Sequence, residues 1–383
     1  MSERDFSEVR RIVVKVGTNL LSSDEGVSLS FLASLCEQIA HIRMMGYQVV
    51  LVTSGAIGIG ARMLNIRERV TSVKLRQACA SIGQPYLMHH YSTFLSSYHI
   101  ITSQILLTTE LFRNRRTYLN TRNTLETLLS LGVLPICNEN DTVSTAEIGS
   151  AFGDNDRLSA YIASKIDADL LIILSDVQGL FSSDPSSDPS AQLISEVPVI
   201  DDRIVTAAGG SGSTFATGGM KTKIKAVEIA SRAGCKCVIA SGREKMILEQ
   251  IAAGREVGTY FYPGKKISQR QRWIRNAQTS GRIIIDQGAV NAIRKRKSLL
   301  PSGVTAVEGS FSAGSVVMIN SIAKAVPSFD STELQQLIGR HSRDIRKITG
   351  SHRRDVIARP EDIVFIDEQK VYVQDNKKQR DLL

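Results

Sequence analysis

Short apolar runs alternate with longer stretches of helical pattern through the first 254 residues of this 383-residue chain. Each run is continuous and rich in β-branched residues, which is typical of strands that are covered on both faces. The runs are residues 12–14, 49–52, 133–136, 170–174 and 237–240. Because they alternate with helical stretches, the pattern predicts βαβ units around a mostly parallel sheet.

Glycines mark where the predicted helices end. A glycine takes up the left-handed backbone conformation that commonly closes a helix. The predicted helices span residues 28–45, 117–131 and 219–233, and they precede Gly46, Gly132 and Gly234. We therefore expect an α/β fold with an open sheet sandwiched between helices.

The residues that follow the predicted strands are polar or glycine-rich. They are Lys15-Val16-Gly17-Thr18, Thr53-Ser54-Gly55-Ala56, Asn138-Glu139-Asn140-Asp141, Ser175-Asp176 and Ser241-Gly242. In open α/β sheets, ligands bind beyond the carboxyl ends of the strands. The sequence thus predicts a polar binding crevice at that edge of the sheet.

The last third of the chain has a different pattern. Strand-like runs at residues 282–288, 315–319 and 363–366, with a helix near 331–337, indicate a small, mainly β domain. We predict a first domain over residues 1–265, a linker over 266–280 and the small domain over 281–383. A Gly/Ser-rich stretch at residues 209–219 is typical of a loop that closes over a site.

Composition narrows the class of protein. No stretch approaches the roughly 18 consecutive apolar residues of a membrane span, and the first residues lack the apolar core of a signal peptide. We expect a cytoplasmic protein that does not bind membranes. The five cysteines include no C-x-x-C pair, and the six histidines form no metal-binding pattern. The sequence therefore predicts reduced cysteines and no metal site built by the protein.

The positive charge is concentrated at one end. Residues 255–383 hold 23 Lys and Arg against 13 Asp and Glu, whereas the first 254 residues hold 24 against 25. The run Arg294-Lys295-Arg296-Lys297 raises RNA binding as an alternative function of the small domain. A solvated helix end is the other interpretation of this run, and the domain has few aromatic residues for base stacking.

The predicted crevice has the residues for phosphoryl transfer. The sequence contains neither a G-x-x-x-x-G-K-[ST] loop nor a G-x-G-x-x-G turn after a strand. Lys15, at the end of a strand, and Lys223, in the first turns of a helix, can still bind phosphate. A carboxylate acceptor needs no general base, so charge neutralisation by two ammonium groups and Mg²⁺ would suffice. Asp154 to Asp156 can serve that site or simply cap a helix.

Six motifs, in order along the first domain, resemble those of the glutamate 5-kinases, members of the amino-acid kinase family. The motifs are Val13-Val14-Lys15-Val16-Gly17-Thr18, Val52-Thr53-Ser54-Gly55-Ala56-Ile57, Asn138-Glu139-Asn140-Asp141 with Thr145-Ala146-Glu147-Ile148, Gly153-Asp154-Asn155-Asp156, Ser175-Asp176-Val177-Gln178-Gly179-Leu180-Phe181 and Thr217-Gly218-Gly219-Met220-Lys221-Thr222-Lys223. The small domain resembles a PUA domain. The resemblance implies the amino-acid kinase fold followed by a PUA-like domain.

The resemblance also implies roles for individual residues. Lys15 and Lys223 would stabilise the transferring phosphoryl group, with Asp156 holding both lysines. Glutamate would be bound by Ser54, Asp141 and Asn155. ATP would be bound by Lys15, Ser175, Asp176, Thr217, Gly218, Gly219, Met220, Lys221, Thr222 and Lys223. Ser175 departs from the family, which usually has threonine there, and we expect a small effect on nucleotide fit.

The activity that the resemblance implies is ATP- and Mg²⁺-dependent phosphorylation of the side-chain carboxylate of L-glutamate. The product, L-glutamyl 5-phosphate, belongs to the first step of proline biosynthesis. The family further implies a homo-oligomer, proline as feedback inhibitor and glutamate-5-semialdehyde dehydrogenase as acceptor of the product. Relatives of the same fold use N-acetylglutamate, aspartate, carbamate or UMP. Asp141 favours an acceptor with a free ammonium group over an acetylated one.

Overall fold

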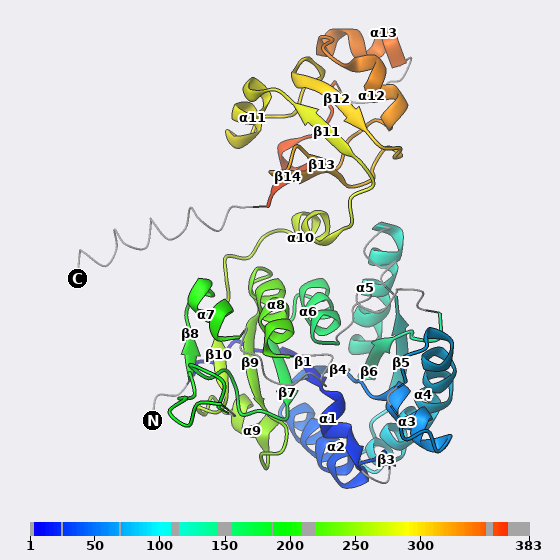
Figure 1. The fold of residues 1–383 in the computed structure, drawn as a ribbon, viewed down its shortest axis with the longest axis vertical. Helices are drawn as coiled ribbons and strands as arrows, with labels where there is room; N and C mark the ends of the chain where they lie inside the picture. Colours follow the sequence, from blue (N-terminus) through cyan, green and yellow to red (C-terminus); the bar gives the residue numbers. More distant parts are fainter. Residues whose placement is uncertain are drawn as a thin grey trace, which may run out of the picture. The chain divides into compact units, whose positions relative to one another are not determined.

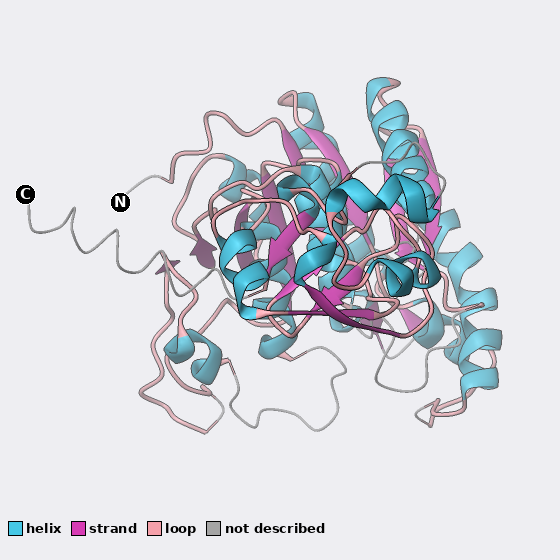
Figure 2. Cartoon of the chain, turned by 90° about the horizontal axis from the view of Figure 1, so that it is seen from above, coloured by secondary structure: helices cyan, strands magenta, loops and turns pink. Residues whose placement is uncertain are grey.

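The computed structural model of the chain contains two compact units (Figure 1). The first unit comprises residues 1–109 and 119–267, and the second comprises residues 110–118 and 268–383. The structure describes residues 4–23, 26–68, 70–108, 115–143, 155–185, 187–208, 219–349 and 355–366. Figure 2 colours the same elements by type, with strands in magenta and helices in cyan.

The first unit is built on an eight-stranded sheet. Its strands, in spatial order, are β5 (Thr102–Leu107), β6 (Leu134–Glu139), β4 (Gln48–Val52), β1 (Arg11–Val16), β7 (Leu170–Ser175), β9 (Lys236–Ser241), β10 (Thr259–Phe261) and β8 (Glu196–Val197). Neighbours from β5 to β9 run parallel, and β10 runs antiparallel to β9. The prediction of a mostly parallel sheet is confirmed, and each of the five predicted runs forms a strand.

Helices cover both faces of this sheet. The helices that lie wholly or mostly in the first unit are α1 (Thr18–Leu21), α2 (Leu29–Met44), α3 (Ala56–Met63), α4 (Val73–Ser96), α5 (Arg115–Ser130), α6 (Asn155–Lys165), α7 (Asp202–Ala207), α8 (Met220–Ser231) and α9 (Ile247–Ala252). A short hairpin, β2 (Ser22–Ser23) and β3 (Gly26–Val27), follows α1. Gly46, Gly132 and Gly234 all have positive φ, so the predicted helix ends are confirmed.

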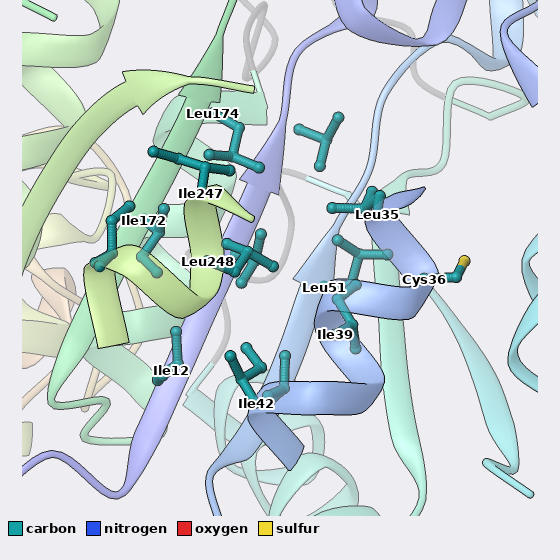
Figure 3. Close-up of a cluster of buried hydrophobic side chains, with 14 of the residues drawn as sticks. Ile12, Leu35, Cys36, Ile39, Ile42, Leu51, Ile172, Leu174, Ile247 and Leu248 are labelled. Atoms are coloured by element: carbon teal, nitrogen blue, oxygen red, sulfur yellow. The ribbon is translucent and has the colours of Figure 1, made fainter. Parts of the chain in front are cut away.

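The main core lies between one face of the sheet and helices α2 and α9 (Figure 3). Ile12, Leu51 and Ile172 of the strands pack there with Ile39 of α2 and Leu248 of α9, and all five are fully buried. Helix α6 packs on the opposite face, against β1, β4, β6 and β7, with α8 beside it. Sandwiching the central strands in this way fixes the positions of their carboxyl ends.

Helices α3 and α4 cross at two glycines. A Cβ atom added to Gly60 would lie 1.9 Å from the Cys79 carbonyl oxygen, and one added to Gly83 would lie 1.9 Å from the Ala56 carbonyl oxygen. Only glycine fits at both positions, because the two backbones are in direct contact. Helix α4 is therefore held close to the turn that leads from β4 into α3.

The second unit holds a five-stranded sheet. Its strands, in spatial order, are β12 (Val304–Glu308), β11 (Arg282–Ile285), β13 (Val317–Ile319), β14 (Ala323–Ala325) and β15 (Ile363–Phe365), and its helices are α10 (Gln269–Asn276), α11 (Gln287–Arg294), α12 (Ser331–Leu337) and α13 (Ile345–Thr349). The prediction of a small, mainly β domain is confirmed. Helix α10 occupies the predicted linker, and its Trp273 packs against Val316, Val326 and Val364.

Among the described residues, no helix combines the length and apolar character needed to cross a bilayer. All five cysteines are buried and free.

Candidate active site

The predicted polar loops meet at one edge of the first sheet. Strands β1, β4, β6 and β7 run parallel, so their carboxyl ends lie on the same side. Lys15 lies near the end of β1, Ser54 follows β4, and Asn138 lies near the end of β6. Helix α6 begins at the same edge with Asn155 and Asp156. Two clusters of side chains result, and each contains one of these two adjacent residues.

Asp156 is the centre of the first cluster. Its Oδ1 lies 2.5 Å from the Lys15 Nζ, and its Oδ2 lies 3.6 Å from the Lys223 Nζ and accepts a hydrogen bond from the Thr222 hydroxyl at 3.1 Å. Asp156 is fully buried, and the two lysines are 4% and 6% exposed. Two ammonium groups share this one carboxylate, so both lysines can also form charge-assisted hydrogen bonds with an anion. We call Lys15, Asp156 and Lys223 the charged cluster.

The start of helix α8 adds backbone donors beside this cluster. Gly219 is the N-cap and is exposed, and Met220, Lys221 and Thr222 form the first turn. The first backbone N–H groups of a helix have no partner within the helix, and the helix dipole attracts anions there. Lys223 points its ammonium group from this turn toward Asp156. The arrangement suits the phosphates of a nucleotide.

Ser175 is the last residue of strand β7, and Asp176 follows it. The Asp176 carboxylate accepts hydrogen bonds from the Asn19 side-chain amide at 2.8 Å and from the Ser175 hydroxyl at 3.0 Å. Burial alone would raise the pKa of Asp176, but these hydrogen bonds and the Lys223 charge outweigh it, so the pKa lies below its usual value. Asp176 is thus held ionised in a fixed orientation.

The second cluster consists of neutral side chains around Asn155. The Asn155 Nδ2 donates to the Thr53 carbonyl oxygen at 2.6 Å, to the Ser54 hydroxyl at 2.9 Å and to the Asn138 Oδ1 at 2.9 Å. The Asn138 Nδ2 in turn donates to the Gln84 Oε1 of helix α4 at 2.8 Å. We call Ser54, Gln84, Asn138 and Asn155 the amide cluster.

Asp141 lies three residues beyond Asn138. Burial raises the pKa of its carboxyl group above the usual value, and the positive charge of Arg76 on helix α4 opposes that shift. A half-buried carboxylate of this kind gains from an additional cationic partner.

Several predicted residues fall outside the described residues. These are Asp154, Thr217, Gly218, the motif at residues 145–148 and most of the Gly/Ser-rich stretch. The structure brings Lys15, Lys223 and Asp156 together, and it brings Ser54 and Asn155 together.

Sequence reasoning missed Gln84, Asn19 and Arg76. Asn138 belongs to a loop that the sequence singled out, but no role was assigned to it. Gln84 and Arg76 lie on helix α4, which the sequence pattern did not predict. Gly83 was the available signal, since a glycine inside a helix often marks a close contact. It could have drawn attention to the polar Gln84 beside it.

Two family models match the chain. Residues 10–241 match the amino acid kinase family, and residues 281–349 match the PUA domain.

Curated relatives match nearly the whole chain. A glutamate 5-kinase of Methanosarcina mazei is 41% identical, with 96% of this chain and 100% of the relative covered. A glutamate 5-kinase of a Thermoanaerobacter species is 43% identical, with 93% and 98% covered. Among solved structures, the UMP kinase of Bacillus anthracis aligns with a TM-score of 0.47 at 16% identity, covering 67% of this chain and 96% of that one.

Proposed function

The chain belongs to the amino acid kinase family, and from that premise we propose that it transfers the γ-phosphoryl group of ATP to the side-chain carboxylate of L-glutamate. The product is L-glutamyl 5-phosphate, and the reaction is the first step of proline biosynthesis. The similarity to glutamate 5-kinases over more than nine-tenths of the chain supports this choice of acceptor. The observation that carries the chemistry is the meeting of Lys15 and Lys223 on Asp156.

The charged cluster neutralises the phosphoryl group in transit. Lys15 and Lys223 present ammonium groups to the oxygens that gain charge, and Asp156 keeps both lysines in place without cancelling their charge. The acceptor carboxylate is already ionised near pH 7 and needs no base. Removing one such donor typically reduces kcat about 100- to 1,000-fold.

Mg²⁺ fits this site as a partner of the nucleotide. The described residues contain no group of three or more His, Cys, Asp or Glu side chains able to hold a metal ion, and the Asp156 carboxylate is shared by two lysines. That donor set suits an ion held mainly by phosphate oxygens. When bound, Mg²⁺ supplies additional positive charge at the phosphates.

The amide cluster and Asp141 orient glutamate. Ser54 and Asn155 offer a hydroxyl and an amide at the edge of the sheet, and the Asp141 carboxylate would face the α-ammonium group. An acetylated acceptor would leave that carboxylate without its cationic partner. Proline carries the same pair of charges, so we include it as an inhibitor that competes for this part of the site.

The acyl phosphate product reacts readily with water. We therefore include glutamate-5-semialdehyde dehydrogenase as the enzyme that accepts this product. Separately, the family resemblance leads us to include a homo-oligomer as the active form.

Trapping of the acyl phosphate tests the proposed function. In the presence of ATP, Mg²⁺ and hydroxylamine, we expect glutamate to yield a hydroxamate, and Lys15→Met to lower the rate at least about 100-fold. Lys225→Met, an exposed neighbour of Lys223 on helix α8, should retain the wild-type rate. Turnover of N-acetylglutamate, aspartate, carbamate or UMP without turnover of glutamate would contradict the choice of glutamate as acceptor but not the proposed kinase activity.

A second candidate function concerns the C-terminal unit. All four residues of the run 294–297 are exposed, which favours attraction of nucleic acid phosphates. Phe311, Phe329 and Trp273 are buried and unable to stack on bases. We therefore assign this unit a structural or regulatory role. RNA binding that persists at 0.2 M salt with sequence preference would contradict this assignment.

A further inference from the structure

A chain of buried side-chain amides leads from helix α4 to the proposed acceptor site. The Gln84 Oε1 accepts from the Asn138 Nδ2, and the Asn138 Oδ1 accepts from the Asn155 Nδ2. Gln84 is 7% exposed and Asn138 is 2% exposed. This series of hydrogen-bonded amides connects Asn155 to helix α4, which contributes no residue to the charged cluster.

Two backbone groups fix the direction of every amide in this chain. The Thr53 carbonyl can only accept, so the Asn155 atom 2.6 Å from it must be the nitrogen. The Glu139 N–H can only donate, so the Asn138 atom 2.9 Å from it must be the oxygen. The other end of the Asn138 amide is then the nitrogen, and the Gln84 atom that faces it must be the oxygen.

This direction determines which atom Asn155 has left for a ligand. All three side-chain hydrogen bonds that Asn155 makes with described residues use the Nδ2, and no described residue donates to its Oδ1. An amide oxygen attracts an ammonium group and repels a carboxylate. The unused Oδ1 therefore matches the positive end of an amino acid.

Gln84 ends the chain with an unpaired donor. Its Nε2 is buried and has no acceptor among the described residues. A leucine of similar size would avoid the destabilisation that an unpaired buried donor brings. The protein therefore keeps a destabilising unpaired donor at this position, and the oxygen of the same Gln84 amide holds Asn138.

We propose that Gln84 and Asn138 are positioning residues that hold the Asn155 amide with its nitrogen toward the protein and its oxygen toward the acceptor. The site thereby selects acceptors that carry a free ammonium group. This inference rests on the proposed function, because it describes how that function chooses its acceptor.

A double-mutant cycle between Gln84 and Asn155 tests the proposal. Gln84→Leu should raise the KM for glutamate about fivefold, with kcat and the KM for ATP within about twofold of wild type. In an Asn155→Ala background, the same change should alter the KM for glutamate less than about 1.5-fold, because the residue it acts through is gone. An equal increase in both backgrounds, or no increase in either, would overturn the proposal.

Two further variants separate positioning from folding. Gln84→Glu keeps an oxygen toward Asn138, so the KM for glutamate should stay within about twofold of wild type. Gln38→Leu removes a buried amide of helix α2, 6% exposed, whose Oε1 accepts from the Leu248 N–H. It should lower the melting temperature without changing the KM for glutamate. A KM effect of Gln38→Leu equal to that of Gln84→Leu would assign Gln84 to stability alone.

Failure of the proposed function can be distinguished from failure of the positioning role. If wild type uses another acceptor in place of glutamate, the same cycle is run with that acceptor. Coupling of Gln84 to Asn155 would then survive the loss of glutamate specificity, and its absence would remove the positioning role as well. If Gln84→Leu does not fold, Gln84→Met takes its place in the cycle.

Discussion

The charged cluster and the amide cluster share the first turn of helix α6 but use opposite chemistry. Asp156 joins two ammonium groups, and its neighbour Asn155 joins only neutral donors and acceptors. Charged side chains strongly stabilise a group whose charge changes during the reaction, here the phosphoryl group. A network of amides instead fixes the orientation of the hydrogen-bonding groups that contact the acceptor. We therefore expect the charged cluster to govern kcat and the amide cluster to govern the KM for the acceptor.

Asp156→Asn should produce the largest effect, because it breaks the charged cluster. Two buried ammonium groups would lose their carboxylate, and removal of one partner from a buried ion pair is strongly destabilising, by about 3–5 kcal/mol. We expect kcat to fall about 100-fold and the melting temperature to drop. Asp201→Asn, which alters the exposed N-cap of α7, should leave kcat unchanged. A large change in the KM for glutamate at wild-type kcat would contradict the assignment of kcat to the charged cluster.

Asn155→Ala breaks the amide cluster at its ligand-facing end. A hydrogen bond to a charged group contributes about 1.5–3 kcal/mol, so the KM for glutamate should rise roughly 10- to 100-fold. The KM for ATP should stay near that of wild type. Initial rates at varied glutamate and at varied ATP measure both constants, with Asn291→Ala on helix α11 as the control. A fall in kcat alone would show that the two clusters are not separable.

Asp141 gives the acceptor side a dependence on pH. Because burial raises its pKa, Asp141 takes up a proton at higher pH than an exposed aspartate, and its attraction for an ammonium group is lost as the pH falls. The KM for glutamate should increase with acidification in wild type. In Asp141→Asn the KM should be higher and less dependent on pH. Arg76→Gln should shift the wild-type increase to higher pH, since Arg76 opposes the raised pKa.

Lys165, at the other end of helix α6, makes the free energy of unfolding depend on pH. Burial lowers its pKa to about 7, against 10.5 for an ordinary lysine, and Cys137 opposes that shift. Between those values the unfolded chain binds more protons, so this residue's contribution to stability improves as the pH rises. Lys165→Met should be more stable than wild type near pH 7, and the difference should shrink toward pH 10. Chemical denaturation at several pH values measures it; a constant difference would contradict the lowered pKa.

The central strands could be predicted because sequence and environment agree there. Strands covered on both faces read as uninterrupted apolar runs, as in Leu170–Ser175. Strand β5, Thr102–Leu107, lies at the edge of the sheet and is only partly buried, so its mixed composition gave no such signal. Antiparallel β10 is fully buried, but its three residues are too few to form a recognisable apolar run.

Helix α4 shows why part of the site could not be predicted. Its buried positions include Cys79, Gly83, Leu87, Tyr91 and Leu95, which recur every four residues. Gly83, the polar Gln84 and Pro85 interrupt the apolar stripe and hide the helix from a hydrophobic pattern. The charged cluster was predictable because its motifs carry the family resemblance. The amide chain depends on contacts between α4, β6 and α6, which only the fold brings together.

The glycine crossing of α3 and α4 limits how this site can diverge. Gly83 precedes Gln84, and its close approach to Ala56 sets how far the Gln84 amide extends toward the sheet. Any side chain at Gly60 or Gly83 would push the two backbones apart and withdraw that amide by an ångström-scale step. A lineage that keeps both glycines keeps the same close approach of helices α3 and α4, so new acceptors would have to arise from changes in the loops.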